Sequence, residues 1–231
     1  MTSAMLKANA RELIKANAPK LFFVAAIYLI IITFLSELQF RLPAPINIYE
    51  ELRTGIITIQ QFSDSIRSNG LLLALLLEIM SPTITIGFKA YCLKTVRKQE
   101  ADYKDLLTGF SIFLKVISLS IITSILITLW SFLFFFPGIA AYYRYRLAYY
   151  ILLDDPSKSV MKCISESKHL MRGKKVELFL IDLSFFPWNI LNILVLSYII
   201  PIFPIVSIWL TPYYGLSQAT YYENIIKQVA V

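Results

Sequence analysis

Two arginines lie near the middle of an apolar segment, FPGIAAYYRYRLAYYILLDDP, at residues 136–156. A guanidinium in the hydrocarbon of a bilayer costs about 2.5–3.5 kcal/mol on insertion scales, so Arg144 and Arg146 need water, headgroups or carboxylate partners. A helical rise of about 1.5 Å per residue places Glu78 near the depth of Arg144, and Asp182 near that of Arg146. The sequence therefore predicts two intramembrane pairs, Glu78 with Arg144 and Asp182 with Arg146.

These four charges allow two interpretations. Pairs of opposite charge can hold helices together, and Arg146 can also extend its aliphatic stem toward the inner headgroups. Alternatively, ionisable groups inside a membrane mark a path for a substrate or an ion. Positions 144 and 146 differ by about 200° around a helix, so the two arginines are expected to face different neighbours.

Enzyme chemistry has no recognisable motif in this chain. No G-x-S-x-G, H-E-x-x-H or glycine-rich phosphate loop occurs in the sequence. His169 is the sole histidine and lies in a basic amphipathic stretch, while Cys92 and Cys163 have no CxxC partner. We therefore expect no catalytic site, no metal site and no cofactor, and a protein that is not an enzyme.

The composition is typical of a membrane protein. Of the 231 residues, 57% are hydrophobic and 16% are charged, whereas a soluble domain carries about 25% charged residues. The net charge of +7 could indicate nucleic-acid binding, but basic segments between long apolar stretches are typical of membrane orientation. We expect membrane lipids, through anionic headgroups at the cytoplasmic face, and other membrane-protein subunits as partners, and no nucleic acid.

Six apolar segments approach the length that a membrane-spanning helix needs. They cover residues 21–38, 71–93, 112–136, 137–153, 176–199 and 202–222. The sequence thus predicts an all-α integral membrane helical bundle of six transmembrane helices, in a single membrane domain over residues 1–231. An outer loop at 39–69 either lies on the outer leaflet as amphipathic helices or forms a lid over an outward-facing cavity.

Lysine and arginine gather before the first span, between the second and third, and between the fourth and fifth, with Lys89 and Lys115 just inside the flanking helices. Because basic loops stay in the cytoplasm, both termini are expected there. The first apolar run begins at Leu21 without an A-x-A-like cleavage site after it, which favours an anchor over a signal peptide.

Short, basic, amphipathic segments precede the odd-numbered spans, at residues 5–20, 101–115 and 157–175. In the first, Leu6, Ala10 and Leu13 share one helical face. In the third, Asp155 or Ser157 would cap a helix that Gly173 ends. Together with a proline in each even-numbered span, these segments indicate a threefold hairpin repeat, an arrangement found in transporters and also in other membrane proteins.

Three segments, FPGIAAYYRYRLAYYILLDDP, SESKHLMRGKKVELFLIDLSFFPW and WLTPYYGLSQATYYENI, resemble a family of bacterial integral membrane proteins defined as a domain of unknown function (number nine-seven-five). The matching positions are Pro137, Gly138, Asp155, Pro156, Ser167, Met171, Gly173, Lys175, Asp182, Ser184, Phe185, Trp188, Pro212 and Tyr213. The N-terminal LKANARELIKAN is also similar, so the resemblance covers most of the chain. It implies a multi-pass protein of a bacterial cell membrane without an established activity. Pro187 departs from the family pattern and would kink the fifth span.

We expect a non-enzymatic accessory or interaction protein of the membrane, whose basic cytoplasmic helices engage anionic lipid or partner subunits. The alternative is a transporter of small solutes or lipids, or a channel-like protein, with its path near Glu78, Arg144, Arg146 and Asp182.

Overall fold

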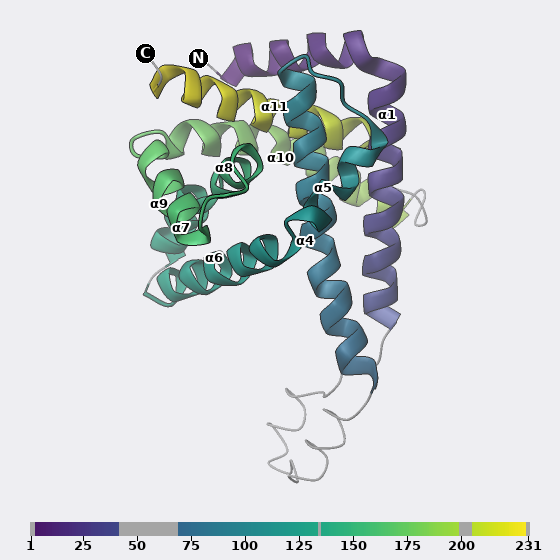
Figure 1. Ribbon diagram of the computed structural model, residues 1–231. Helices are drawn as coiled ribbons and strands as arrows, with labels where there is room; N and C mark the ends of the chain where they lie inside the picture. The colour runs from purple at the N-terminus through teal and green to yellow at the C-terminus, as the bar shows by residue number, and fades with distance from the viewer. Residues whose placement is uncertain (1–2, 42–68, 134, 199–204, 230–231) are drawn as a thin grey trace.

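The computed structural model describes residues 3–41, 69–133, 135–198 and 205–229 (Figure 1). Within these ranges the chain forms helices and no strand, which confirms the all-α class. Residues 42–68 of the expected outer loop lie outside the described residues, so the choice between surface helices and a lid stays a prediction.

The first helix, α1 (Ser3–Arg41), joins the expected amphipathic segment and the first span into one element. It changes direction part-way along its length (Figure 1), and it contains Pro19, which removes a helical hydrogen bond and favours a kink. Its first part packs against α11 (Ile205–Val229) and buries Leu6, Ala10 and Ile14. The apolar face of this segment is therefore covered by protein.

The second helix, α4 (Asn69–Val96), runs beside the second part of α1 (Figure 1). The rings of Tyr28 and Phe88 stack between them with centroids 4.5 Å apart. A short 3-10 helix, η1 (Tyr103–Leu107), and α5 (Thr108–Ser111) then return along α4. A Cβ atom on Gly87 would lie 1.9 Å from the carbonyl oxygen of Leu106, so this close approach requires glycine.

The expected fourth span is divided into two helices. After α6 (Phe113–Leu133), the chain forms α7 (Phe135–Tyr145) and α8 (Ala148–Asp154). Pro137 lies in the first turn of α7, where its missing N–H costs little. A Cβ on Gly138 would lie 2.2 Å from Oγ of Ser131 on α6, so the two helices meet closely there. The break between α7 and α8 falls at Arg146.

The last three helices are α9 (Val160–Leu170), α10 (Lys175–Tyr198) and α11. Ser159 caps α9 by accepting from the N–H of Lys162, so the expectation that Asp155 or Ser157 caps it is wrong. The side chain of Asp155 instead accepts from the N–H of Ser157 at 3.1 Å and closes the preceding turn. Gly173 adopts the expected left-handed conformation, with φ of 77°, between α9 and α10.

Three helical stretches are long and apolar enough to cross a membrane, namely Ala4–Gln39, Phe113–Phe132 and Lys175–Leu194. In their most apolar windows, 22%, 17% and 17% of the residues are buried, so most residues there keep some exposed surface in the described part of the chain. Six spans stay a prediction. In Figure 1, α6 is strongly inclined to α4, and α11 crosses the upper end of α4 instead of running along it.

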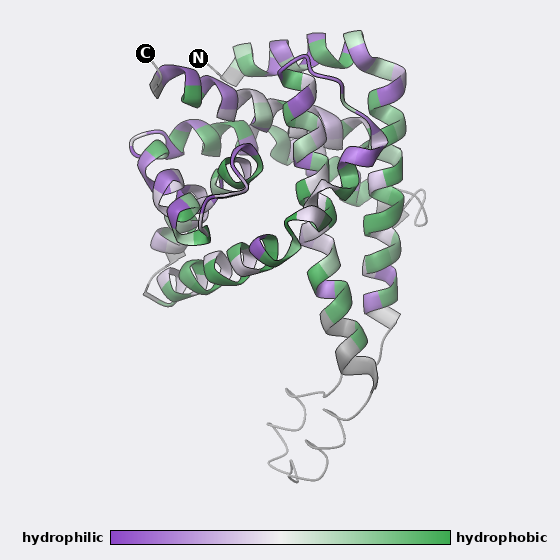
Figure 2. Ribbon diagram, viewed as in Figure 1, coloured by the Kyte–Doolittle hydropathy of each residue, from purple (hydrophilic) through white to green (hydrophobic). Residues whose placement is uncertain are grey.

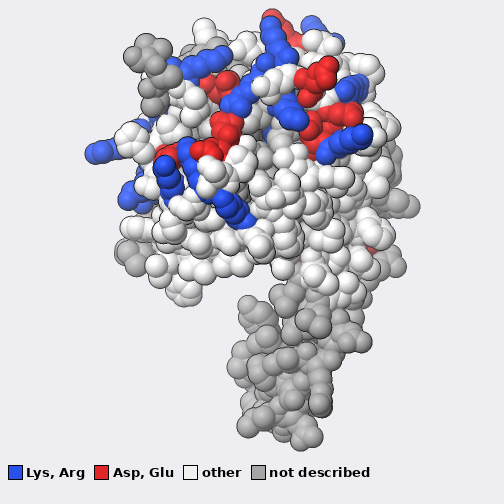
Figure 3. Space-filling view, viewed as in Figure 1, with Lys and Arg blue, Asp and Glu red and all other residues white. Residues whose placement is uncertain are grey.

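Polar and apolar residues separate along the molecule. Hydrophobic residues dominate α6 and the lower parts of α1 and α4, whereas hydrophilic residues concentrate toward the upper end (Figure 2). Lysine, arginine and the acidic side chains gather at that same end on the face shown in Figure 3. The beginning of α1 and the end of α11 also lie there (Figure 1).

Candidate functional site

Arg146 and Asp182 meet in the interior of the helix assembly. A guanidinium nitrogen of Arg146 forms an ion pair with Oδ2 of Asp182. Tyr143 donates its hydroxyl to the same oxygen at 2.9 Å, and Tyr214 donates to Oδ1 at 3.0 Å. Arg146 also donates to the hydroxyl of Tyr214. The cluster thus joins α7, the α7–α8 break, α10 and α11.

Aromatic rings enclose this arginine. Its central guanidinium carbon lies 5.1 Å from the ring centroid of Tyr142, and 5.7 Å from those of Tyr143 and Tyr214. The side chains of Arg146 and Asp182 are 8% and 19% exposed. The pair is therefore largely removed from solvent, and its hydrogen bonds offset the cost of removing both charges from water.

Glu78 and Arg144, both within the described ranges, are joined by no hydrogen bond or ion pair, which corrects the predicted pair. Glu78 accepts from the side-chain amide of Gln39 at 2.7 Å. Arg144 lies over Trp130 of α6, 5.6 Å from the ring centroid. Counting residues along parallel helices estimates depth but fixes no lateral position, and Arg144 lies on α7, which packs against α6.

A basic hollow of about 470 Å³ surrounds Arg144. Its described lining consists of Arg144, Ser165, Lys168, His169, Arg172 and Lys175, without an acidic side chain. Ser167 donates its hydroxyl to the carbonyl of Arg144 at 2.8 Å and so holds α9 against α7. The turn at Gly173 then brings the start of α10 to the same place.

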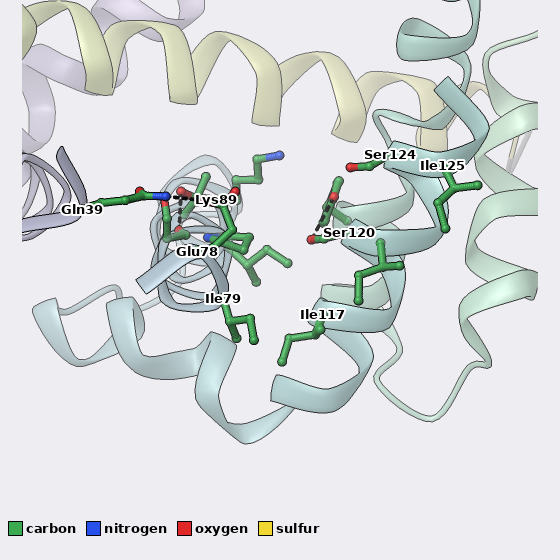
Figure 4. Close-up of a pocket in the computed structure, with 14 residues that line it drawn as sticks. Gln39, Glu78, Ile79, Lys89, Ile117, Ser120, Ser124 and Ile125 are labelled. Atoms are coloured by element: carbon green, nitrogen blue, oxygen red, sulfur yellow. Dashed lines mark hydrogen bonds between the residues drawn. The ribbon is translucent and has the colours of Figure 1, made fainter. Parts of the chain in front are cut away.

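Two further cavities meet between α4 and α6. The larger, of about 650 Å³, runs from Glu78 toward Lys89 (Figure 4). The smaller, of about 360 Å³, is lined by Arg146, Tyr214 and Gln218 among others. Lys89, Ser124 and Tyr149 line both cavities, which are therefore neighbours. Sequence reasoning used Lys89 as an orientation signal and did not place it beside a cavity.

A charge network ties the chain together at the basic end. Arg97 binds both carboxylate oxygens of Asp154, at 2.6 and 3.0 Å, and its Nε donates to Glu223 at 2.8 Å. Tyr222 donates to Asp154 at 2.7 Å. The hydrogen bond to Asp154 is the main cause that raises the pKa of Arg97. This network links α4, α8 and α11 and was not evident from the sequence.

Most residues of the expected family motif have structural partners. Lys115 donates to the carbonyl of Pro156 at 2.5 Å, which holds the 155–158 turn against α6. Met171 is fully buried. The Trp188 ring lies edge-on to Trp209 at 5.5 Å, and Tyr213 accepts from Arg11 of α1 at 3.1 Å.

The remaining motif residues lie on the last two helices. Ser184 donates its hydroxyl to the carbonyl of Ile181, and its own carbonyl accepts from Lys7 at 3.4 Å. Pro187 and Pro212 lie inside α10 and α11, which continue through them. Within the described ranges, no group of three or more His, Cys, Asp or Glu residues could hold a metal ion.

These motif residues fall within a stretch of the chain that matches a family model. Residues 135–229 match the model of a family described as protein of unknown function (DUF975). The expected family resemblance is confirmed over this stretch. The match begins at α7 and ends with α11, so it contains Arg146, Asp182 and Tyr214, and it leaves the similarity of the N-terminal segment untested. No curated protein and no solved structure matches the chain.

Proposed function

We propose that this protein is a non-enzymatic, multi-pass protein of the bacterial cell membrane that holds anionic lipid headgroups at its basic end. The observation that carries the proposal is the basic hollow, which gathers Arg144, Lys168, Arg172 and Lys175 without an acidic residue in its described lining. Such a group of like charges repels itself, and a bound anion removes the repulsion.

The local fold explains why these cations converge. Lys168 lies in the last turn of α9, and Arg172 follows in the turn before Gly173, so both side chains line the hollow. The bond from Ser167 to the carbonyl of Arg144 fixes α9 beside α7. Serine and arginine side chains can donate to the non-bridging oxygens of a phosphate, and arginine can do so with two parallel hydrogen bonds.

The membrane assignment supports a lipid as the source of the anion. Apolar side chains such as Leu114, Phe132 and Phe34 are 77%, 85% and 65% exposed, and apolar surface exposed on this scale needs a lipid or protein cover. Because basic segments stay in the cytoplasm, we assign the charged end to the cytoplasmic face. The anionic lipids of that leaflet attract such segments by about 1 kcal/mol per basic residue.

The test compares two double variants that each remove two positive charges. K168M/R172M alters the hollow, whereas K15M/K104M removes two exposed cations elsewhere in the chain. Purified protein in neutral detergent is titrated with phosphatidylglycerol or phosphatidylcholine, and bound lipid is counted by native mass spectrometry. We expect a preference for phosphatidylglycerol that K15M/K104M keeps and K168M/R172M loses. Equal binding of both lipids by the unaltered protein would refute the proposal.

A second candidate function is the transport of a small solute or lipid along the interior charges. The observation that favours it is the pair of neighbouring cavities that share Lys89 and lead from Glu78 toward Arg146. Proteoliposomes with fluorescent phosphatidylglycerol in both leaflets test lipid transfer through dithionite quenching. Quenching beyond one half, lost in an Asp182→Asn variant, supports this candidate, whereas rates equal to empty liposomes argue against it.

A further inference from the structure

Lys89 lines both of the neighbouring cavities between α4 and α6. It extends from α4 toward the side of α6 that carries Ser120 and Ser124 (Figure 4). Among the described residues its ammonium has no carboxylate partner, and its Nζ lies 4.7 and 5.5 Å from the ring centroids of Tyr149 and Tyr150. Lys89 is half-buried, and a positive charge partly removed from water is stabilised when a negative group accompanies it.

The neighbouring charges do not supply that group. Asp182 forms its ion pair with Arg146 and accepts from two tyrosines. Glu78 lines the far end of the larger cavity, eleven residues from Lys89 and hence about 16 Å along the helix, and it accepts from Gln39. Among the residues that the structure describes, the ammonium of Lys89 is therefore left without a counter-charge.

Gln218 adds a hydrogen-bond donor to the same place. It lines the smaller cavity together with Lys89 and is 5% exposed. Within the described part of the chain, its side-chain nitrogen has no hydrogen-bond partner. Buried polar groups are almost always bonded, so an unpartnered amide N–H beside a cavity indicates that an acceptor can occupy the space.

The shape of the larger cavity suggests what accompanies that acceptor. On the α6 side, this cavity is lined by Ile117, Ile121 and Ile125, and on the α4 side by Ile79 (Figure 4). A cavity with isoleucines along one side and a cation at one end matches a molecule with an anionic head and an apolar tail.

We propose that the cavity at Lys89 and Gln218 binds an anionic group of the carboxylate or phosphate class, as a free anion or as the head of an amphiphile whose chain lies along the isoleucines. The ammonium supplies charge, and the amide supplies a directed N–H. This site lies apart from the basic hollow and does not depend on the lipid contacts proposed there.

The experiment uses the full chain in phosphatidylcholine nanodiscs. Inorganic phosphate and dodecyl phosphate are titrated separately by isothermal calorimetry, with empty nanodiscs subtracted. K89M removes the cavity cation, and K104M is the matched control, because Lys104 is an exposed lysine outside the cavities. We expect K104M to bind as the unaltered protein does, and K89M to bind about tenfold more weakly or worse, as expected for the loss of a charge-assisted hydrogen bond.

The two probes separate the sources of the anion. If the unaltered protein binds both probes and K89M loses both, the site accepts free anions. If the unaltered protein binds dodecyl phosphate but not inorganic phosphate, and K89M loses dodecyl phosphate, the site accepts the head of an amphiphile. Equal affinities of K89M and K104M, or no binding of either probe to the unaltered protein, would overturn the inference.

Two more variants guard against misfolding of K89M. K89R keeps the charge and should retain binding within a few-fold, whereas Q218E places a carboxylate in the cavity and should weaken it about tenfold. Unchanged affinity in a folded Q218E variant would also overturn the inference. The K168M/R172M variant, which alters the basic hollow, should bind dodecyl phosphate in the cavity as the unaltered protein does. The test at Lys89 can therefore be interpreted even if lipid headgroups do not bind in the basic hollow.

Discussion

Replacing Asp182 by leucine should be among the most destabilising single changes at the polar cluster. The substitution keeps the branching at Cγ but removes the acceptor of three hydrogen bonds, one from Arg146 and one each from Tyr143 and Tyr214. It also leaves the guanidinium of Arg146, whose side chain is 8% exposed, without its counter-charge. Removal of one partner from a buried pair typically costs about 3–5 kcal/mol.

A double-mutant cycle isolates the pair from the cavity that any substitution leaves. D182L, R146M and the double variant are unfolded with sodium dodecyl sulfate from mixed micelles, and helicity is followed by circular dichroism. The double variant should lose less stability than the sum of the single variants, by about 1–3 kcal/mol, because it contains no unpaired charge. The surface pair Lys158–Glu166, with side chains 24% and 34% exposed, provides the control. E166Q should cost less than about 1 kcal/mol.

Equal stabilities of D182L and E166Q would refute this reasoning. So would strict additivity in the cycle, because it would show that Arg146 and Asp182 contribute independently. A charge-swapped R146D/D182R variant adds a functional criterion. Restored folding without restored phenotype would mean that the cluster serves a path or a ligand in addition to packing.

Two further predictions concern the surrounding fold. Gly87→Ala should lower stability by about 1–3 kcal/mol or more, because its Cβ would meet the backbone oxygen of Leu106 at 1.9 Å. Gly215→Ala is the control and should cost less, because the nearest atom there belongs to a side chain, the sulfur of Cys92 at 2.8 Å. The stabilities come from the same detergent titration, and equal losses would contradict the packing. Burial raises the pKa of the Cys163 thiol. In a Cys92→Ala background, alkylation of Cys163 by N-ethylmaleimide should therefore be slow at about pH 8 in the folded protein. The rate should begin to rise at a higher pH in the folded protein than in the unfolded chain. Labelling at the same rate in folded and unfolded protein would contradict this.

Several long helices were predictable because they follow from the local sequence. Long apolar runs, and the proline and glycine between them, mark α4, α6 and α10 closely. The break between α7 and α8 was not predicted, since the apolar run through residues 147–153 continues without a helix-breaking residue. At this break, Arg146 contacts Asp182 and tyrosines from other helices. These contacts depend on the tertiary fold and not on the local sequence.

Only the Arg146–Asp182 pair of the candidate site was predictable from the sequence. Asp182 was an obvious partner for Arg146, because acidic residues inside the apolar runs are scarce. The same depth argument failed for Glu78, since lateral position depends on how the helices pack. Lys89 and Gln218 carry no pattern of their own in the sequence. Their importance follows from sharing one cavity, which a single sequence does not reveal.

The most direct test of the central claim is the sidedness of labelling in intact cells. In a background lacking Cys92 and Cys163, single cysteines replace Lys174, Lys104 or Glu50, of which Glu50 lies outside the described residues. A membrane-impermeant maleimide should label E50C in intact cells, and should label K174C and K104C only after permeabilisation. Labelling of E50C and K174C from the same side would contradict a membrane protein whose basic end faces the cytoplasm.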